Sequence, residues 1–178
     1  EVLSRWNFWN RDLDIGVLRK DHVDVLLKFA RTGKVVSLVG VRRSGKTTLM
    51  KQMIKLLIEG GTNRSDILMV NFEEPEFEGA DVGLLQRIYE AYLEVVKPVG
   101  KPFVFLDEIQ NVRGWERFVR SLNERGEAFV TISGSSSKLL SSELASVLTG
   151  RQIHFEVLPL GFREFLGFCG VEIRGMKD

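Results

Sequence analysis

Hydrophobic and polar positions along the chain alternate between short apolar runs and longer segments with helical spacing. The short runs, rich in β-branched and aromatic residues, cover 35–39, 66–72, 103–106 and 129–132, with a last candidate strand at 152–157. Helical spacing covers 18–31, 48–57, 82–96 and 115–124. Strands that are apolar on both faces and alternate with helices predict an α/β fold, with a parallel sheet covered on two sides by right-handed crossovers.

The segment between the first strand and its helix reads GVRRSGKTT and matches in full the phosphate-binding loop pattern GxxxxGK[ST], the Walker A motif. Its glycines allow a backbone that directs consecutive N–H groups at a triphosphate. The lysine then reaches the β and γ phosphates, and the first threonine is placed to hold Mg²⁺. The predicted nucleotide-binding residues are Gly40, Val41, Arg42, Arg43, Ser44, Gly45, Lys46, Thr47 and Thr48.

A second motif is the apolar strand FVFL that ends in Asp107 and Glu108, in the manner of a Walker B motif. A carboxylate beside a triphosphate suits a hard dication, so we predict that Asp107 binds Mg²⁺, directly or through water. Glu108, one residue further, is placed to accept a proton from water aligned on the γ-phosphate, or to position that water. The chain lacks the NKxD segment that reads guanine, which argues against a GTPase.

Polar residues at the ends of the other strands are candidates for sensing the γ-phosphate. In the serine-rich turn 133–137, Ser135 is the preferred catalytic candidate and Ser133 the next, although this turn could equally cap a helix. Asn71 ends the second strand and could hold Glu108 away from the water.

Arg151 precedes the last candidate strand and is a candidate catalytic arginine. An arginine brought to the γ-phosphate, from the same chain or a neighbour, stabilises charge in the transition state. Equally, Arg151 could be a surface residue that pairs with Glu156 or Glu164. Arg42 and Arg43 lie at the tip of the phosphate loop, where backbone amides grip the ligand, so their side chains are expected to face solvent or a partner.

Other eye-catching residues are expected to be structural. Trp6, Phe8 and Trp9 could stack on an adenine ring, but aromatic residues at such a position more often anchor a segment to the core. His22 and His154 are isolated from other histidines and cysteines at metal-ligand spacing, so neither is predicted to bind a metal.

Composition sets the broad limits. The 178 residues are 44% hydrophobic and 28% charged, which is typical of one globular domain. The net charge of +1 does not indicate a general affinity for nucleic acid or membranes. A single cysteine, Cys169, fits a reducing cytoplasm. The sequence has no long apolar run and no signal-peptide pattern, so neither membrane insertion nor export is expected.

Taken together, several segments resemble the archaeal and bacterial AAA-type P-loop ATPases over about residues 20–168. They are the loop 40–48, LDEIQNV at 106–112 with Trp115, SGSS at 133–136, LTGR at 148–151 and LPLGFREF at 158–165. The resemblance implies an AAA-like three-layer αβα sandwich, with a mainly parallel five-stranded sheet of the additional-catalytic-glutamate class. It implies Mg²⁺-ATP binding by Lys46, Thr47 and Asp107, with hydrolysis by Glu108. Gly161 departs from the small polar residue that relatives tend to carry.

The ends of the sequence suggest a piece of a longer protein, since it lacks an initial Met and stops just after a new apolar segment. We expect an N-terminal segment and helix at 1–33, an ATPase core at 34–160, and at 161–178 the start of a further region. The resemblance implies that this region continues into a C-terminal domain, with winged-helix or nuclease-like character in some relatives.

The favoured hypothesis is an ATPase whose hydrolysis drives a conformational change in an attached domain or partner. Its rival is a nucleotide-binding switch with little hydrolysis. Phosphoryl transfer to a small molecule is less favoured, because an acid beside Asp107 suits activation of water. Expected partners are ATP and ADP, a protein partner or a second copy, and DNA through the C-terminal domain. A membrane is not an expected partner.

Overall fold

A parallel sheet forms the centre of the molecule. The computed structural model describes residues 2–135, 139 and 150–170. Its five-stranded sheet has the order β2-β3-β4-β1-β5, and every neighbouring pair of strands is parallel. The strands are β1 (Val35–Val39), β2 (Ile67–Asn71), β3 (Phe103–Asp107), β4 (Phe129–Gly134) and β5 (Gln152–Glu156). The predicted α/β class is confirmed, and β4 separates the strand of the phosphate loop from the strand that ends in the two acids.

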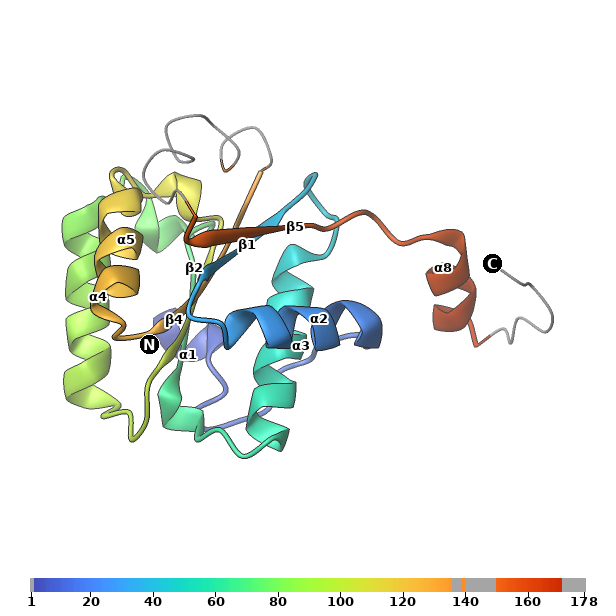
Figure 1. Cartoon of the computed structure of the whole chain (residues 1–178), viewed down its shortest axis with the longest axis horizontal. Helices are drawn as coiled ribbons and strands as arrows, with labels where there is room; N and C mark the ends of the chain where they lie inside the picture. Colours follow the sequence, from blue (N-terminus) through green and yellow to red (C-terminus); the bar gives the residue numbers. More distant parts are fainter. Residues whose placement is uncertain (1, 136–138, 140–149, 171–178) are drawn as a thin grey trace.

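Helices cover both faces of this sheet, as expected for an αβα sandwich (Figure 1). One layer holds α2 (Lys20–Ala30) and α3 (Lys46–Glu59), and the other holds α4 (Val82–Val95) and α5 (Trp115–Arg125). Successive strand residues point to opposite faces. In β1, Val36 and Leu38 join the core beneath α2 and α3, while Val35 and Val39 join the other core. The uninterrupted apolar strands therefore feed two separate cores.

The helix boundaries follow local rules of capping. α3 begins after Gly45, whose φ of +97° is a left-handed conformation that favours glycine. α4 begins after Asp81, whose side chain accepts a hydrogen bond of 2.9 Å from the Leu84 N–H. α5 ends at Gly126, which has a φ of +64°. These three boundaries thus lie where the sequence supplies a capping residue.

The N-terminal segment covers the β2 edge of the sheet. It contains a short helix, α1 (Val2–Trp6), which the sequence pattern did not predict. The Asn7 amide accepts from the Met69 N–H at 2.7 Å and donates to the Met69 carbonyl at 2.8 Å, so it pairs with the strand as a peptide group would. Phe8 is buried in the core, and the Trp9 indole donates to the Ile67 carbonyl at 2.7 Å. These aromatic residues anchor the segment, so the adenine-stacking alternative is wrong for Phe8 and Trp9.

After β5 the chain passes beyond the carboxyl edge of the sheet to a further helix, α8 (Phe162–Phe168), which projects from the body (Figure 1). Short 3₁₀ turns lie at Arg64–Asp66, Pro75–Phe77 and Ile109–Asn111. Ser136, Ser137, Leu148 and Thr149 of the recognised segments lie outside the described residues. Within the part that is described, no helix has the length and apolar character that a membrane span requires.

Candidate nucleotide-binding site

The phosphate loop joins β1 to α3 and depends on its two glycines. A Cβ added to Gly40 would lie 2.3 Å from the Val157 carbonyl oxygen and 2.9 Å from Ser44 Oγ, so only glycine fits there. Gly45 and Arg43 both have positive φ, +97° and +66°. The backbone therefore curls tightly before the helix, as a loop that presents amides to an anion must do.

Polar groups inside the loop are suited to phosphate oxygens. The Lys46 side chain is only 5% exposed, and its ammonium donates to the carbonyls of Gly40 and Val41 at 3.1 Å each. Ser44 Oγ is buried and has no hydrogen-bond partner among the described residues. A buried cation and an unpartnered hydroxyl at a helix N-terminus are groups that a phosphate would satisfy.

Asp107 forms the centre of a buried hydroxyl network at the end of β3. Thr47 Oγ1 donates to Asp107 Oδ2 at 2.7 Å, and Ser133 Oγ donates to Oδ1. Burial raises the pKa of the fully buried Asp107 carboxyl, although these two hydrogen bonds act in the opposite direction. Adjacent hydroxyl and carboxylate oxygens are donors that Mg²⁺ prefers, so Thr47 and Asp107 fit the predicted metal site.

Glu108 lies next to this network, at the mouth of the loop. Its backbone is left-handed, with φ +51° and ψ +44°, and its N–H donates to Ser133 Oγ at 3.1 Å. The carboxylate Oε1 is 3.6 Å from the Lys46 ammonium, and Oε2 accepts a hydrogen bond from the Gln110 amide. Glu108 therefore lies beside Lys46, the residue expected to contact the γ-phosphate.

The structure distinguishes between the predicted sensing residues. Ser133 is the serine that contacts both acids, whereas in the described part of the chain the Ser135 side chain makes no hydrogen bond with either acid. A catalytic role of Ser135 stays a prediction without a contact to support it. Asn71 accepts a hydrogen bond from the Glu73 N–H at 2.8 Å, and the donor to the Glu108 carboxylate in the described structure is Gln110. That Asn71 holds Glu108 stays a prediction without a contact to support it.

Arg151 lies at the amino end of β5, at the opposite edge of the sheet from the phosphate loop. Its carbonyl accepts from the Val35 N–H, at the start of β1. A five-residue strand separates the two edges by about 17 Å. The side chain pairs with Glu124 at 2.6 Å, so the suggested partners Glu156 and Glu164 were wrong. In this position Arg151 cannot reach the phosphates of its own chain, and only a role in a neighbouring chain remains a prediction.

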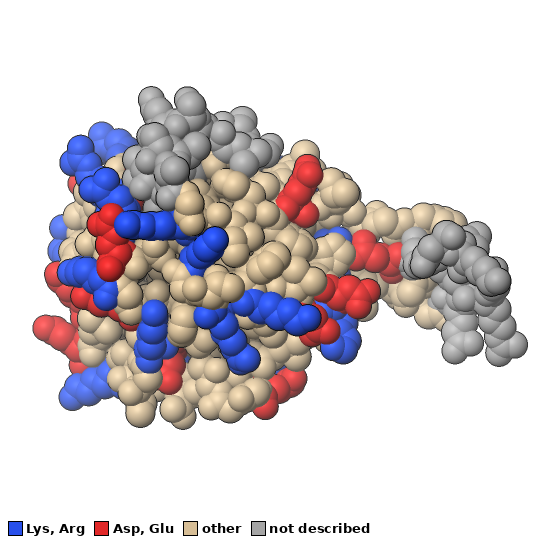
Figure 2. Space-filling model, in the orientation of Figure 1, with Lys and Arg blue, Asp and Glu red and all other residues tan. Residues whose placement is uncertain are grey.

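Arg42, at the tip of the phosphate loop, has an exposed side chain, as predicted. The Arg42 side chain is 82% exposed and pairs with Glu73 at 2.9 Å. Lysines, arginines and acidic residues are interspersed over the face of the molecule in Figure 2. The Arg42 side chain therefore belongs to the solvated surface, whereas the backbone of the same loop belongs to the candidate site.

Arg19 is a member of the site that sequence reasoning missed. Its guanidinium is almost buried and donates to the Ser44 carbonyl of the loop at 3.3 Å. It also makes two hydrogen bonds to Glu164 of α8, at 2.7 and 3.2 Å. Burial opposes ionisation of Glu164, but the Arg19 guanidinium and the Gly161 N–H hold the pKa of this carboxyl below its usual range. An arginine before an amphipathic helix gave no signal of this contact.

A pocket of about 420 Å³ adjoins Arg19. It lies between the segment that leads into α2 and the helix α8, and its volume falls in the range of small-molecule sites. It is lined by Val17, Leu18, Arg19, Lys20, Asp21, His22, Glu164, Gly167 and Phe168. The pocket therefore lies beside the phosphate loop, on the side where α8 leaves the body.

The sheet order, the loop and the acid network define a P-loop nucleotide-binding protein. A family model described as an AAA domain matches residues 32–166. The chain belongs to this AAA-domain family, which supports nucleotide binding of the ATPase kind at the loop.

Relatives from bacteria and archaea share most of this chain. A protein of Haemophilus influenzae is 34% identical over 151 residues, which are 84% of this chain and 37% of that protein. A protein of Methanocaldococcus jannaschii is 33% identical over 174 residues, 98% of this chain and 34% of that protein. Both are described as uncharacterized proteins. The chain thus spans about a third of the length of these relatives.

Solved structures support the fold. A closed-state reconstruction of Hsp104 with ATPyS and FITC casein has a TM-score of 0.64 at 14% identity, over 89% of this chain and 30% of that chain. The PCH-2 protein of C. elegans has a TM-score of 0.52 at 17% identity, over 79% of this chain and 43% of that chain. At such identities the similarity concerns the fold alone.

Proposed function

We propose that this chain binds Mg²⁺-ATP at the loop 40–48 and hydrolyses it. The observation that carries the proposal is the position of the Glu108 carboxylate, 3.6 Å from the buried Lys46 ammonium and next to the Thr47–Asp107 pair. A phosphate-binding loop alone supports binding only. A carboxylate that faces the expected γ-phosphate adds a group able to take a proton from water.

Each residue has a separate task in this scheme. The loop amides and Lys46 bind the phosphates, while Thr47 and Asp107 would hold Mg²⁺, which would supply charge neutralisation at the phosphate oxygens. Glu108 accepts a proton from the attacking water while the oxygen of that water forms a bond to the γ-phosphorus. The bond to the β,γ-bridging oxygen breaks, and ADP and inorganic phosphate leave. We place the nucleoside end of ATP in the pocket beside Arg19, because Arg19 both lines this pocket and contacts the loop at Ser44.

The contact of Arg19 with both the loop and α8 supports coupling of nucleotide binding to the C-terminal segment. Its guanidinium joins the Ser44 carbonyl to the Glu164 carboxylate. A loop that rearranges around phosphates changes this arrangement, so α8 can pass the change to an attached domain, a protein partner, a second copy or a DNA-binding region. The same link would serve a switch that binds ATP without rapid turnover, which is the second candidate function.

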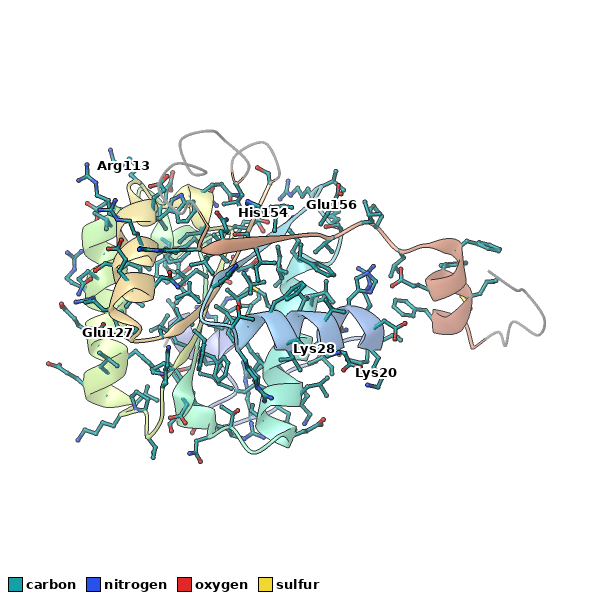
Figure 3. All side chains as sticks on the ribbon, in the orientation of Figure 1. Lys20, Lys28, Arg113, Glu127, His154 and Glu156 are labelled. Atoms are coloured by element: carbon teal, nitrogen blue, oxygen red, sulfur yellow. The ribbon has the colours of Figure 1, made fainter. Side chains whose placement is uncertain are left out.

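Phosphate release and ATP binding of the wild type and three variants test the proposal. We expect that Lys46→Ala loses ATP binding, because it removes a buried cation from the loop. Glu108→Gln should keep ATP binding while turnover falls by roughly 10²–10⁴, the usual effect of losing a positioned base. Glu156→Gln is the matched control, since Glu156 is an exposed carboxylate at the loop end of β5 (Figure 3).

The outcomes separate the candidate functions. Unchanged turnover in Glu108→Gln would overturn the role of Glu108 as the base. Tight ATP binding without measurable turnover in the wild type would favour the switch. Equal effects of Glu108→Gln and Glu156→Gln would show that the loss is electrostatic and general rather than specific to the site.

A further inference from the structure

Gln110 contacts the Glu108 carboxylate from only two positions further along the chain. Glu108 adopts a left-handed backbone, and residues Ile109–Asn111 form a 3₁₀ turn. This turn brings the Gln110 side chain back toward the strand end, where its Nε2 donates to Glu108 Oε2. The other carboxylate oxygen, Oε1, stays 3.6 Å from the Lys46 ammonium. One oxygen is thus held while the other faces the loop.

The environment of the Gln110 amide indicates that packing alone does not explain it. Its Oε1 is buried without a hydrogen-bond partner among the described residues. It approaches Gly134 so closely that a Cβ there would lie 2.1 Å from this oxygen. Burial of an unpartnered amide oxygen is unfavourable, and an apolar side chain would fill the same space without that penalty. The bond to Glu108 is the interaction that an apolar side chain could not make.

We propose that Gln110 is a positioning residue that orients the Glu108 carboxylate for hydrolysis. Ser133 fixes the backbone of Glu108 through its N–H, and Gln110 fixes the side chain through Oε2. Oε1 then faces the loop beside Lys46, where it can take the proton of the attacking water, and fewer side-chain orientations compete with the productive one. This inference rests on the proposed hydrolytic function of Glu108. It assigns to Gln110 the contact that the sequence suggested for Asn71.

The position of Gln110 separates its effect on turnover from any effect on binding. The described hydrogen bonds of its side chain connect it with Glu108 and with no residue of the loop 40–48. Nucleotide affinity depends on the loop and on Lys46, which do not rely on this bond. A loss of Gln110 should therefore lower kcat and leave the ATP dissociation constant unchanged.

Gln110→Met tests the inference, because methionine keeps the length and lacks the N–H donor. We expect kcat to fall roughly 10- to 100-fold, the effect of losing one hydrogen bond to a charged group, with unchanged ATP affinity and KM. Gln86→Met is the matched control, since Gln86 donates to Glu90 at 2.9 Å on the exposed face of α4. This control should turn over ATP like the wild type.

A double-mutant cycle decides whether Gln110 acts through Glu108. In the Glu108→Gln background, Gln110→Met should change the residual turnover less than about twofold, because the group that it orients is already lost. An equal loss in both backgrounds, or an unchanged kcat in the single variant, would overturn the inference. If Gln110→Met does not fold, Gln110→Asn supplies an amide too short to reach Oε2, and the same loss of kcat is expected.

The failure of this inference can be told from the failure of the proposed function. If Glu108→Gln turns over ATP like the wild type, the hydrolytic role of Glu108 is wrong and the inference falls with it. If Glu108→Gln is impaired while Gln110→Met is not, the hydrolytic role stands and only the positioning role of Gln110 is wrong.

Discussion

Two pairs of charged residues at opposite ends of the strands lie in opposite environments. We call the side of the sheet where the strands end the carboxyl edge, and the side where they begin the amino edge. At the carboxyl edge, Asp107 is fully buried and the Lys46 side chain is 5% exposed. At the amino edge, the pair Arg151 and Glu124 is 52% and 46% exposed. A buried charge is unfavourable unless it is paired, whereas an exposed ion pair contributes little to stability either way. The difference indicates that the buried charges Asp107 and Lys46 have a role in binding a ligand, whereas the exposed pair Arg151 and Glu124 belongs to the solvated surface.

Replacement of Asp107 is the strongest test of this comparison. Asp107→Asn removes the carboxylate that we propose holds Mg²⁺, so turnover should fall at least about 100-fold. The variant also removes a buried carboxyl group whose pKa is raised by burial. It should therefore increase the Tm of the nucleotide-free protein by about 2–4 °C, which corresponds to ~1 kcal/mol in the free energy of unfolding. Thermal unfolding and phosphate release measure the two effects.

A lower Tm for Asp107→Asn would break the comparison, because it would mean that the buried carboxylate stabilises the fold. Asp24→Asn is the control, since Asp24 belongs to an exposed pair with Lys20 on α2. It should change neither turnover nor, beyond about 0.5 kcal/mol, stability.

Ser133 and Ser135 allow a comparison of two serines within the carboxyl edge. Ser133→Ala leaves the Asp107 carboxylate and the Glu108 N–H each without one partner, so we expect a loss of about 1–3 kcal/mol in the free energy of unfolding, together with lower turnover. Ser135→Ala removes a hydroxyl with no such contacts in the described structure. Its free energy of unfolding should stay within about 0.5 kcal/mol of the wild type.

Denaturant unfolding and steady-state turnover of the two variants provide the measurement. A larger loss of turnover in Ser135→Ala than in Ser133→Ala would restore the original assignment of Ser135 and contradict the importance of the network. Equal small effects would show that neither serine contributes.

The fold and the core of the site could be predicted because their signals are local. An apolar run such as 35–39 and the loop that follows it are read from consecutive residues, and so is the pair Asp107 and Glu108. The short helices α1 and α8 were missed because their few residues show little periodicity. The predicted division of the chain at 33 and 160 stays a prediction.

The remaining parts of the site depend on which strands are neighbours and on side-chain directions. β4 lies beside β3, and this pairing brings Ser133 rather than Ser135 to Asp107. Leu106 pairs with Ile132, so the next residues of the two strands, Asp107 and Ser133, are neighbours, whereas Ser135 lies beyond the end of β4. This register depends on the pairing of two distant strands, so the sequence alone could not choose between the serines. The contact of Arg19 with Glu164 spans 145 residues and had no sequence signal.

The Arg19–Glu164 contact tests whether the carboxyl edge communicates beyond itself. Glu164→Gln weakens the ion pair, so ATP should alter hydrogen exchange of the α8 amides less than in the wild type, while ATP affinity changes less than about threefold. The pKa of Glu164 is lowered in the folded protein. The stabilisation by the ion pair is therefore fully present at a pH above 4.5, the ordinary pKa of this carboxyl, and it is lost as the pH falls through the lower folded pKa. At neutral pH the Glu164 carboxylate should therefore stay ionised.

The control for this link is Glu127→Gln, which weakens the exposed pair of Glu127 with Arg125. It should leave the exchange of α8 unchanged. If ATP alters α8 exchange equally in the wild type and in Glu164→Gln, the coupling through Arg19 is wrong even where ATP turnover is normal.

Arg151 carries the smallest expected effect on the isolated chain and the sharpest test of the amino edge. Arg151→Ala breaks an exposed pair, so stability should change by less than about 1 kcal/mol and ATP affinity should not change. If Arg151 acts on a neighbouring copy, Arg151→Ala and Glu108→Gln should each turn over ATP slowly, and a mixture should recover activity. In such a mixture, one copy supplies Glu108 and the other supplies Arg151. Full activity of Arg151→Ala alone at high protein concentration would leave this arginine as a surface residue.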